Sequence, residues 1–152
     1  MSRDEQPEIA NNIRMFGQHL VCVHADDNSP ADFEPFVYSI GNYEAGFPEL
    51  LFIGSNGNWC CDILNILGRI QRERGSAFHH RELVDYTAKF PALIVQAGQK
   101  ACDEYAVQAG VYYDVDRFDV CQILLADQNG KYPGDPECLP PYSEQIVLLK
   151  NH

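Results

Sequence analysis

This sequence has few positively charged residues. Its 152 residues include 11 Lys and Arg against 22 Asp and Glu, which gives a formal net charge of −11. Contact with a nucleic-acid backbone or an anionic membrane surface depends on Lys and Arg, so this charge argues against both kinds of partner. It fits solubility first and, more specifically, a basic protein partner.

Long apolar runs and a secretion signal are also missing. No run approaches the roughly 18 residues that a membrane helix needs, and the start, MSRDEQPEIANN, lacks the charged-then-apolar order of a signal peptide. Six cysteines are present, but a chain with 45% hydrophobic residues can bury a core without disulfides. We therefore expect a cytoplasmic protein with reduced, mostly buried thiols.

The usual signatures of phosphate binding, catalysis and metal binding are absent. The turn GSNGNW, residues 54–59, has neither the Walker spacing with its Lys nor a Gly-x-Gly-x-x-Gly, and it is one residue short of a Gly-x-Ser-x-Gly elbow. His80-Arg81-Glu82 resembles half of a zinc deaminase signature, but the chain has no Cys-x-x-Cys. We expect no metal and no cofactor, and the failed motifs favour a protein that is not an enzyme.

What is present is a pattern of strands and helices. Apolar residues with period 3.6 from Cys60 to Ile70 predict an amphipathic helix of about four turns, which begins near Asn58 and ends at Gly75. The apolar run 49–54 predicts a strand that is buried on both faces. Further expected elements are strands at 19–24, 36–41, 92–98, 118–127 and 146–149 and a helix at 99–109.

Strands and helices do not alternate strictly along the chain. We therefore predict an α+β fold with a mainly antiparallel sheet of five to six strands and two main helices, and we leave a partly barrel-like sheet open. Residues 1–16 are interpreted as a polar N-terminal arm that could hold a short helix, and residues 17–152 as a single domain, a size that one domain commonly has.

Three groups of residues are candidates for chemistry. Cys61 lies in the first turn of the predicted helix, where the dipole lowers a thiol pKa, and His79 or His80 would have to act as its base. The ordinary alternative is that the cysteines belong to the core. Arg69 and Arg72 could bind an anion, or they could simply match the helix dipole. Candidates for contact with a flavin or nicotinamide nucleotide are Ser39, Ser55, Asn56 and Trp59.

The stretch YSIGNYEAGFPELLFIG, residues 38–54, is similar to a bacterial family catalogued as domain of unknown function 4262. That family has Tyr-Thr-Ile-Gly, a variable stretch, His-Pro-Glu-Leu and an apolar run ending in Gly, and later a Pro-Trp-Asp-Pro block. This chain departs from the pattern at Phe47 and Gly134, which replace His and Trp. The resemblance implies no agreed activity. The matching residues include Tyr38, Gly41, Pro48, Glu49, Leu50, Gly54, Pro133, Asp135 and Pro136.

Glu49 is unusual because it is a carboxylate that leads a strand we expect to be buried. Since buried charges must be paired, it is either solvated at the end of the strand or bonded to backbone amides. The sequence leaves both alternatives open.

Elimination leaves a binding protein as the leading hypothesis, a small acidic module in the manner of bacterial immunity or inhibitor proteins. The cluster VYYDVDRFD, residues 111–119, is the expected contact region, because Tyr is enriched at interfaces. The alternatives are a flavin- or nucleotide-binding protein or reductase similar to a split barrel, and a structural subunit. The expected contact residues are Tyr112, Tyr113, Asp114, Asp116 and Asp119.

Overall fold

The computed structural model describes residues 6–55, 57–86 and 88–149. Within them, six strands form one sheet in the order β1-β2-β3-β6-β5-β4, and every neighbouring pair is antiparallel except β3 and β6. The α+β class and the mainly antiparallel sheet are confirmed, and the sheet is open rather than barrel-like. The strands are β1 (His19–Val23), β2 (Phe36–Ile40), β3 (Glu49–Ile53), β4 (Glu82–Val84), β5 (Ala92–Ala97) and β6 (Val120–Leu124).

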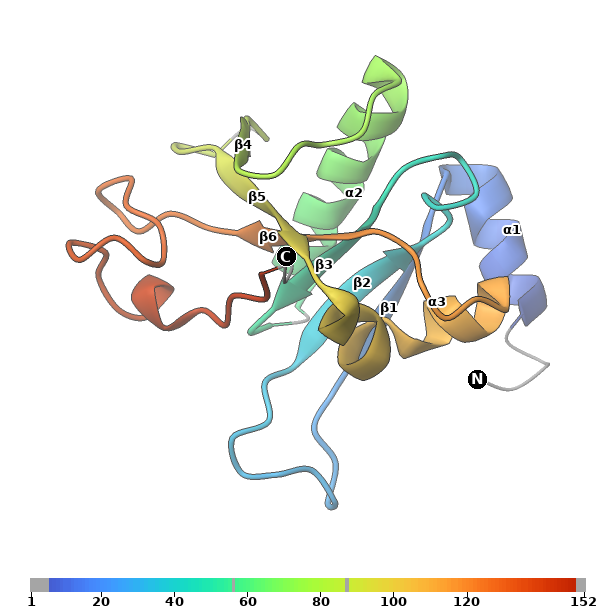
Figure 1. Ribbon diagram of the computed structural model, residues 1–152, viewed down its shortest axis with the longest axis horizontal. Helices are drawn as coiled ribbons and strands as arrows, with labels where there is room; N and C mark the ends of the chain where they lie inside the picture. The colour runs from blue at the N-terminus through green and yellow to red at the C-terminus, as the bar shows by residue number, and fades with distance from the viewer. Residues whose placement is uncertain (1–5, 56, 87, 150–152) are drawn as a thin grey trace.

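Helices cover both faces of this sheet (Figure 1). Helix α2 (Asn58–Arg74) packs Leu64 and Leu67 against Leu50 on one face. Helices α1 (Gln6–Phe16) and α3 (Val107–Tyr113) and the π-helical turn η1 (Ala101–Tyr105) lie against the other face. Strands β2, β3 and β6 are buried at every position, as the apolar run of β3 predicted. Each leucine so buried contributes about 1.5–3 kcal/mol.

Helix α2 forms where its periodicity predicted it. Its buried positions include Cys60, Ile63, Leu64 and Leu67. Gly75 closes the helix with a left-handed φ of 71°, and its N–H donates to Gln71 O. The helix begins at Asn58, as predicted, and Gly57 is its N-cap.

Three further regions add to the expectation or differ from it. The segment 6–16, part of the predicted polar arm, forms α1, and its Ile9 is only 2% exposed in the core. The predicted helix at 99–109 is two shorter pieces, η1 and α3, so the described residues contain three α-helices rather than two main ones. Strand β4 lies in a segment for which the sequence pattern predicted neither a strand nor a helix.

The predicted last strand at 146–149 is wrong, because side chains rather than a ladder of backbone bonds hold this segment. Gln122 on β6 donates to Ile146 O, and its Oε1 accepts the Leu148 N–H at 2.8 Å. Gln145 bonds both the N–H and the C=O of Leu125, at 3.0 and 2.8 Å. The two amide side chains provide the hydrogen bonds that a neighbouring strand would otherwise provide.

Candidate functional site

The carboxylate of Glu49, at the first position of β3, is completely buried, with 0% of the residue exposed. Its Oε1 accepts the Ser39 hydroxyl at 2.7 Å, and its Oε2 accepts the N–H groups of Gly41 at 3.1 Å and Tyr43 at 3.0 Å. The Tyr113 phenol also donates to Oε2. We call these five residues the Glu49 network. Of the two alternatives left open by the sequence, the carboxylate is bonded to amides and not solvated.

The turn after β2 gives the network its geometry. Gly41 has a φ of 126°, a conformation that other residues rarely adopt. The three successive N–H groups of Gly41, Asn42 and Tyr43 all donate to the Glu49 carboxylate. Successive backbone amides in a turn form an anion-binding concavity, and here the anion is a side chain of the protein itself.

Asn42 and Gln18 connect the network to Arg72 on α2. Arg72 Nη1 donates to Asn42 Oδ1 at 2.8 Å and to Gln18 Oε1 at 3.0 Å. Gln18 Nε2 donates onward to Leu64 O at 3.1 Å. A Cβ atom on Gly68 would lie 2.2 Å from Gln18 Oε1, so the helix needs a glycine here for the buried amide to fit. Arg72, which the sequence suggested as a residue that could bind an anion, thus donates its hydrogen bonds to groups of the protein itself.

The Glu49 carboxyl group is shielded from solvent, and its hydrogen-bond partners are groups of the protein itself. Burial raises the pKa of Glu49 above its ordinary value of 4.5, and the hydrogen bonds from Tyr113, Tyr43 and Ser39 offset part of that rise. Burial and the adjacent carboxylate raise the pKa of Tyr113, so its phenol keeps the proton that it donates. Among the described residues no buried side-chain nitrogen or oxygen lacks a partner. The network therefore anchors the 41–49 segment to the sheet and to α3.

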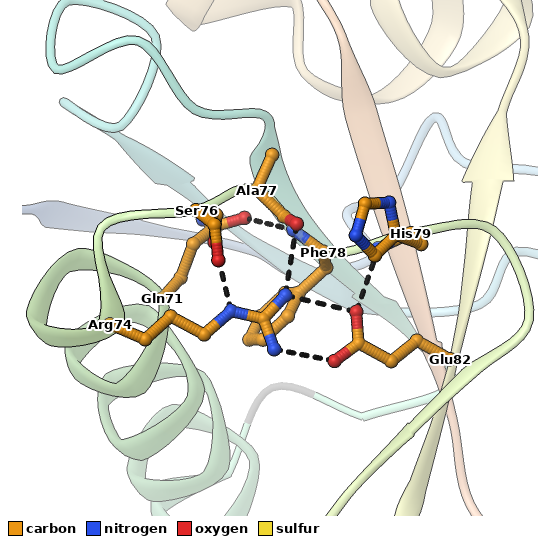
Figure 2. Close-up of polar contacts among 7 residues, drawn as sticks. All are labelled: Gln71, Arg74, Ser76, Ala77, Phe78, His79 and Glu82. Atoms are coloured by element: carbon orange, nitrogen blue, oxygen red, sulfur yellow. Dashed lines mark hydrogen bonds and ion pairs between the residues drawn. The ribbon is translucent and has the colours of Figure 1, made fainter.

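A second polar cluster joins the end of α2 to β4 (Figure 2). The Arg74 guanidinium bonds both oxygens of Glu82, and it donates to Ser76 O and Ala77 O at 2.9 Å each. The N–H of His79 donates to Glu82 Oε1 at 2.8 Å. Arg74 lowers the pKa of Glu82 through this pairing. The cluster is partly exposed and fixes the α2–β4 connection.

The structure does not bring the predicted catalytic residues together. Cys61 is in the first turns of α2, and His79 and His80 follow its last turn, so much of a 17-residue helix, about 25 Å long at 1.5 Å per residue, separates them. His80 Nδ1 accepts the N–H of Gln96 at 2.9 Å. Burial raises the pKa of the Cys61 thiol to about 11, opposite to the lowering that we expected from the helix dipole. The side chains that raise the pKa of Cys61 further are Cys22 and Asp62, and neither His79 nor His80 is among them.

The predicted ligand-binding residues are divided among different places. Ser39 belongs to the Glu49 network. Ser55 and Trp59 line a cleft of about 300 Å³ beside Gln145, and Arg69 and Arg72 line another of about 630 Å³ between α1 and α2. Asn56 lies outside the described residues.

Two of the predicted contact residues lie together in a cleft beside α3. This cleft has a volume of about 790 Å³, and we call it the acidic cleft. Asp119 lines a different and larger cleft of about 890 Å³ with Arg117 and Phe118. Tyr112 and Tyr113 are half-buried rather than exposed, because α3 packs them against the core. The acidic cleft is lined by Cys102, Asp103, Val107, Gly110, Val111, Asp114, Val115, Asp116 and Phe118.

The residues that carried the family resemblance have mainly structural positions. Tyr38 is buried, and its hydroxyl accepts the Gln108 N–H at 3.1 Å. Pro48 is buried at the entrance to a central strand, and Leu50 is 0% exposed. Gly54 ends β3 with a φ of 118°. The later block, Pro133 to Pro136, forms a turn in which Asp135 accepts the N–H of Glu137 at 2.9 Å.

Sequence reasoning missed the amide side chains that complete these networks. Gln18, Asn42, Gln71 and Gln122 are all nearly or fully buried. Gln71, for example, accepts the Phe78 N–H at 3.0 Å and donates to Pro48 O at 3.4 Å. For Gln71 the helical spacing gave a signal, because it follows Leu64 and Leu67 on the buried side of α2.

The sequence was compared with family models, curated proteins and solved structures, and only a family model matches it. None of the helices in the described segments is long and apolar enough to cross a membrane. No curated protein and no solved structure matches the sequence significantly. A family model described as a domain of unknown function (DUF4262) matches residues 12–139, which is most of the chain, and the chain therefore belongs to that family.

Proposed function

We propose that the protein is a small acidic binding module of the cytoplasm that engages a basic segment of a partner protein, in the manner of an immunity or inhibitor protein. The observation that carries the proposal is the acidic cleft. It combines exposed apolar surface with three aspartates, and none of its lining residues is Lys or Arg. Such a lining suits a partner segment that presents an apolar side chain between basic ones.

The apolar part of the cleft is a pair of valines on α3. Val107 and Val111 are each 48% exposed, and they stand one helical turn apart on the same side of the helix. The opposite side of α3 buries Ala109 in the core. The valines are therefore available to contact an apolar side chain of the partner, and their burial would contribute to its affinity.

The charged part consists of Asp103, Asp114 and Asp116, all exposed. Aspartates on the rim of an apolar patch attract Lys and Arg, which speeds association and selects against acidic partners. The net charge of −11 adds to this field. Binding that depends on these residues weakens as salt rises, because salt screens charges at exposed positions.

The thiols support the cytoplasmic part of the proposal. All six cysteines are free, and four of them are buried. Free thiols persist in reducing compartments, whereas oxidising compartments favour disulfides.

The nucleotide alternative has less support. Ser55 and Trp59 do share a cleft, but Glu34 and Glu144 line it as well and no Lys or Arg does. Two carboxylates in a small cleft repel phosphate, so this site does not favour a flavin or nicotinamide nucleotide.

The test uses a defined probe and two double variants. A short amphipathic Lys/Leu peptide is titrated into the isotope-labelled protein, and amide chemical shifts are followed by NMR. We expect the largest shifts within residues 102–118 and roughly tenfold weaker binding for Asp114→Asn/Asp116→Asn, which corresponds to about 1.4 kcal/mol. The same variant should lose a partner that the native protein retains from an extract of its host at low salt.

The matched control is Asp27→Asn/Asp32→Asn, which removes the same charge from two exposed aspartates in the β1–β2 connection. This control should bind like the native chain. Equal weakening by both double variants would mean that only net charge matters, and the acidic cleft would then not be the binding site.

A further inference from the structure

Cys22 and Cys61 bring two thiols together at an accessible edge of the molecule. Their Sγ atoms lie 3.7 Å apart, although the residues are 39 positions apart in the sequence. Cys22 is on the edge strand β1 and is exposed, and Cys61 is half-buried near the start of α2. The two sulfurs are thus in contact, and one of them can be reached by a reagent from solution.

The other four cysteines are held in the interior. Cys60 is 0% exposed and Cys121 is 1% exposed. Cys102 donates to Phe118 O at 3.2 Å, and Cys138 donates to Lys131 O at 3.3 Å. Burial raises the pKa of all four thiols, most clearly that of Cys121 to about 12, which keeps them protonated and unreactive.

A metal site is not what this pair resembles. No group of three or more His, Cys, Asp or Glu side chains with the geometry of a metal site occurs among the described residues, whereas a structural zinc ion takes four ligands. Two thiols in contact, with one exposed, are instead the arrangement of a protein dithiol that exchanges with disulfides.

We propose that Cys22 and Cys61 are a redox-active dithiol, which a low-molecular-weight disulfide such as oxidised glutathione converts to an intramolecular disulfide. This site is independent of the acidic cleft.

The reaction has two steps. Cys22 loses its proton and its sulfur attacks the reagent, which breaks the S–S bond, releases one thiol and leaves a mixed disulfide on Cys22. Cys61 then loses its proton and attacks the Cys22 sulfur, which releases the second thiol. The protein gives up two electrons and two protons, and the reagent becomes two thiols. The exposed Cys22 attacks first, because burial and the neighbouring Cys22 raise the pKa of Cys61.

The product is a covalent link between the edge strand β1 and helix α2. The two sulfurs must approach from 3.7 Å to the bonded length of about 2.05 Å, a movement within the reach of side-chain rotation. A link that closes a 39-residue separation restricts the unfolded chain, so the oxidised protein should melt several degrees higher than the reduced one.

The experiment exposes the full chain to mixtures of reduced and oxidised glutathione, traps thiols with N-ethylmaleimide under denaturing conditions and maps the products by mass spectrometry. We expect free thiols to fall from six to four and a Cys22–Cys61 linked peptide pair to appear. Cys61→Ser should stop at a glutathione adduct on Cys22, and Cys22→Ser should form neither adduct nor link. The neighbouring control Cys60→Ala should form the link like the native chain.

Three results would overturn the proposal. One is a native chain that keeps all six thiols at the most oxidising mixture. Another is a stable glutathione adduct on Cys22 that never resolves to the Cys22–Cys61 link. The third is loss of the disulfide in Cys60→Ala, which would mean that Cys60, and not Cys61, is the partner of Cys22.

Discussion

Two groups of carboxylates in this protein have opposite surroundings. Glu49 is completely buried and accepts hydrogen bonds from three backbone amides, two hydroxyls and the side-chain amide of Asn42. In the acidic cleft, Asp103, Asp114 and Asp116 face solvent beside exposed valines. A buried carboxylate must be fully bonded to be tolerated, whereas an exposed one remains available to a partner. The same chemical group is thus fully hydrogen-bonded within the fold in one place and exposed to solvent in the other.

The two regions are also physically connected, because Tyr113 belongs to both neighbourhoods. Its hydroxyl donates to Glu49, and its residue is the last of α3, directly before Asp114. Tyr113 also packs against Tyr43 at 4.7 Å between ring centroids. The Glu49 network therefore fixes the end of the helix that carries Val107 and Val111.

The largest effect is expected from Glu49→Ala, which removes the common acceptor of the Ser39 hydroxyl, the Tyr113 phenol and the N–H groups of Asn42 and Tyr43. We expect the free energy of unfolding to fall by about 3–5 kcal/mol, because several donors lose their acceptor together and each buried unsatisfied one costs about 1–3 kcal/mol. Urea denaturation measures it. Asp116→Ala, at an exposed carboxylate, should stay within about 0.5 kcal/mol of the native chain. Equal losses for the two variants would remove the contrast between the two regions.

Tyr113→Phe should have an intermediate effect, because it deletes one donor to Glu49 and keeps the ring. We expect a loss of about 1–3 kcal/mol in the free energy of unfolding. Since the Tyr113 hydrogen bond lowers the pKa of Glu49, the variant should also raise that pKa further, which carboxyl NMR can follow. The matched control is Tyr112→Phe, because the Tyr112 hydroxyl makes no hydrogen bond within the described chain. A native-like Tyr113→Phe would show that the phenol does not support the carboxylate.

Glu82→Gln should have the smallest effect of these three variants, because the Arg74–Glu82 pair is partly exposed and solvent screens it. Arg74 lowers the pKa of Glu82 below its ordinary value of 4.5, so the pair stabilises the folded state above that pH and loses its contribution as the pH falls through the lowered pKa. We expect the native chain to exceed the variant by about 0.5–1 kcal/mol at pH 7, reduced by solvent screening, and the difference to vanish in acid.

The control for this pair is Glu137→Gln. Its carboxylate, 76% exposed, lies 3.4 Å from Lys131. Loss of so exposed an ion pair should change stability by only a few tenths of a kcal/mol at pH 7. If the difference in the free energy of unfolding between the native chain and Glu82→Gln grew in acid, the pKa of Glu82 would not be lowered in the folded state.

The sequence predicted elements whose signals are local. The helix of Asn58 to Arg74 followed from its period and from Gly75, and the buried β3 followed from an unbroken apolar run. The odd position of Glu49 was also visible. Its partners were not, because Tyr113 lies 64 residues away and no local pattern pairs them. The expected strand at 146–149 failed for a related reason, since two glutamine side chains occupy the positions of backbone partners.

The sequence by itself determined the charge, the α+β class, the family motif and the amphipathic helix, because composition and periodicity act within a few residues. Only the tertiary structure decided which polar groups form hydrogen bonds with one another and which remain exposed to solvent. It turned Tyr113 inward, opened a cleft between Asp103 and Asp116, and put Cys22 beside Cys61. The physical reason is that these contacts join segments of distant strands and helices, and their geometry exists only once the sheet and its two helical layers have packed.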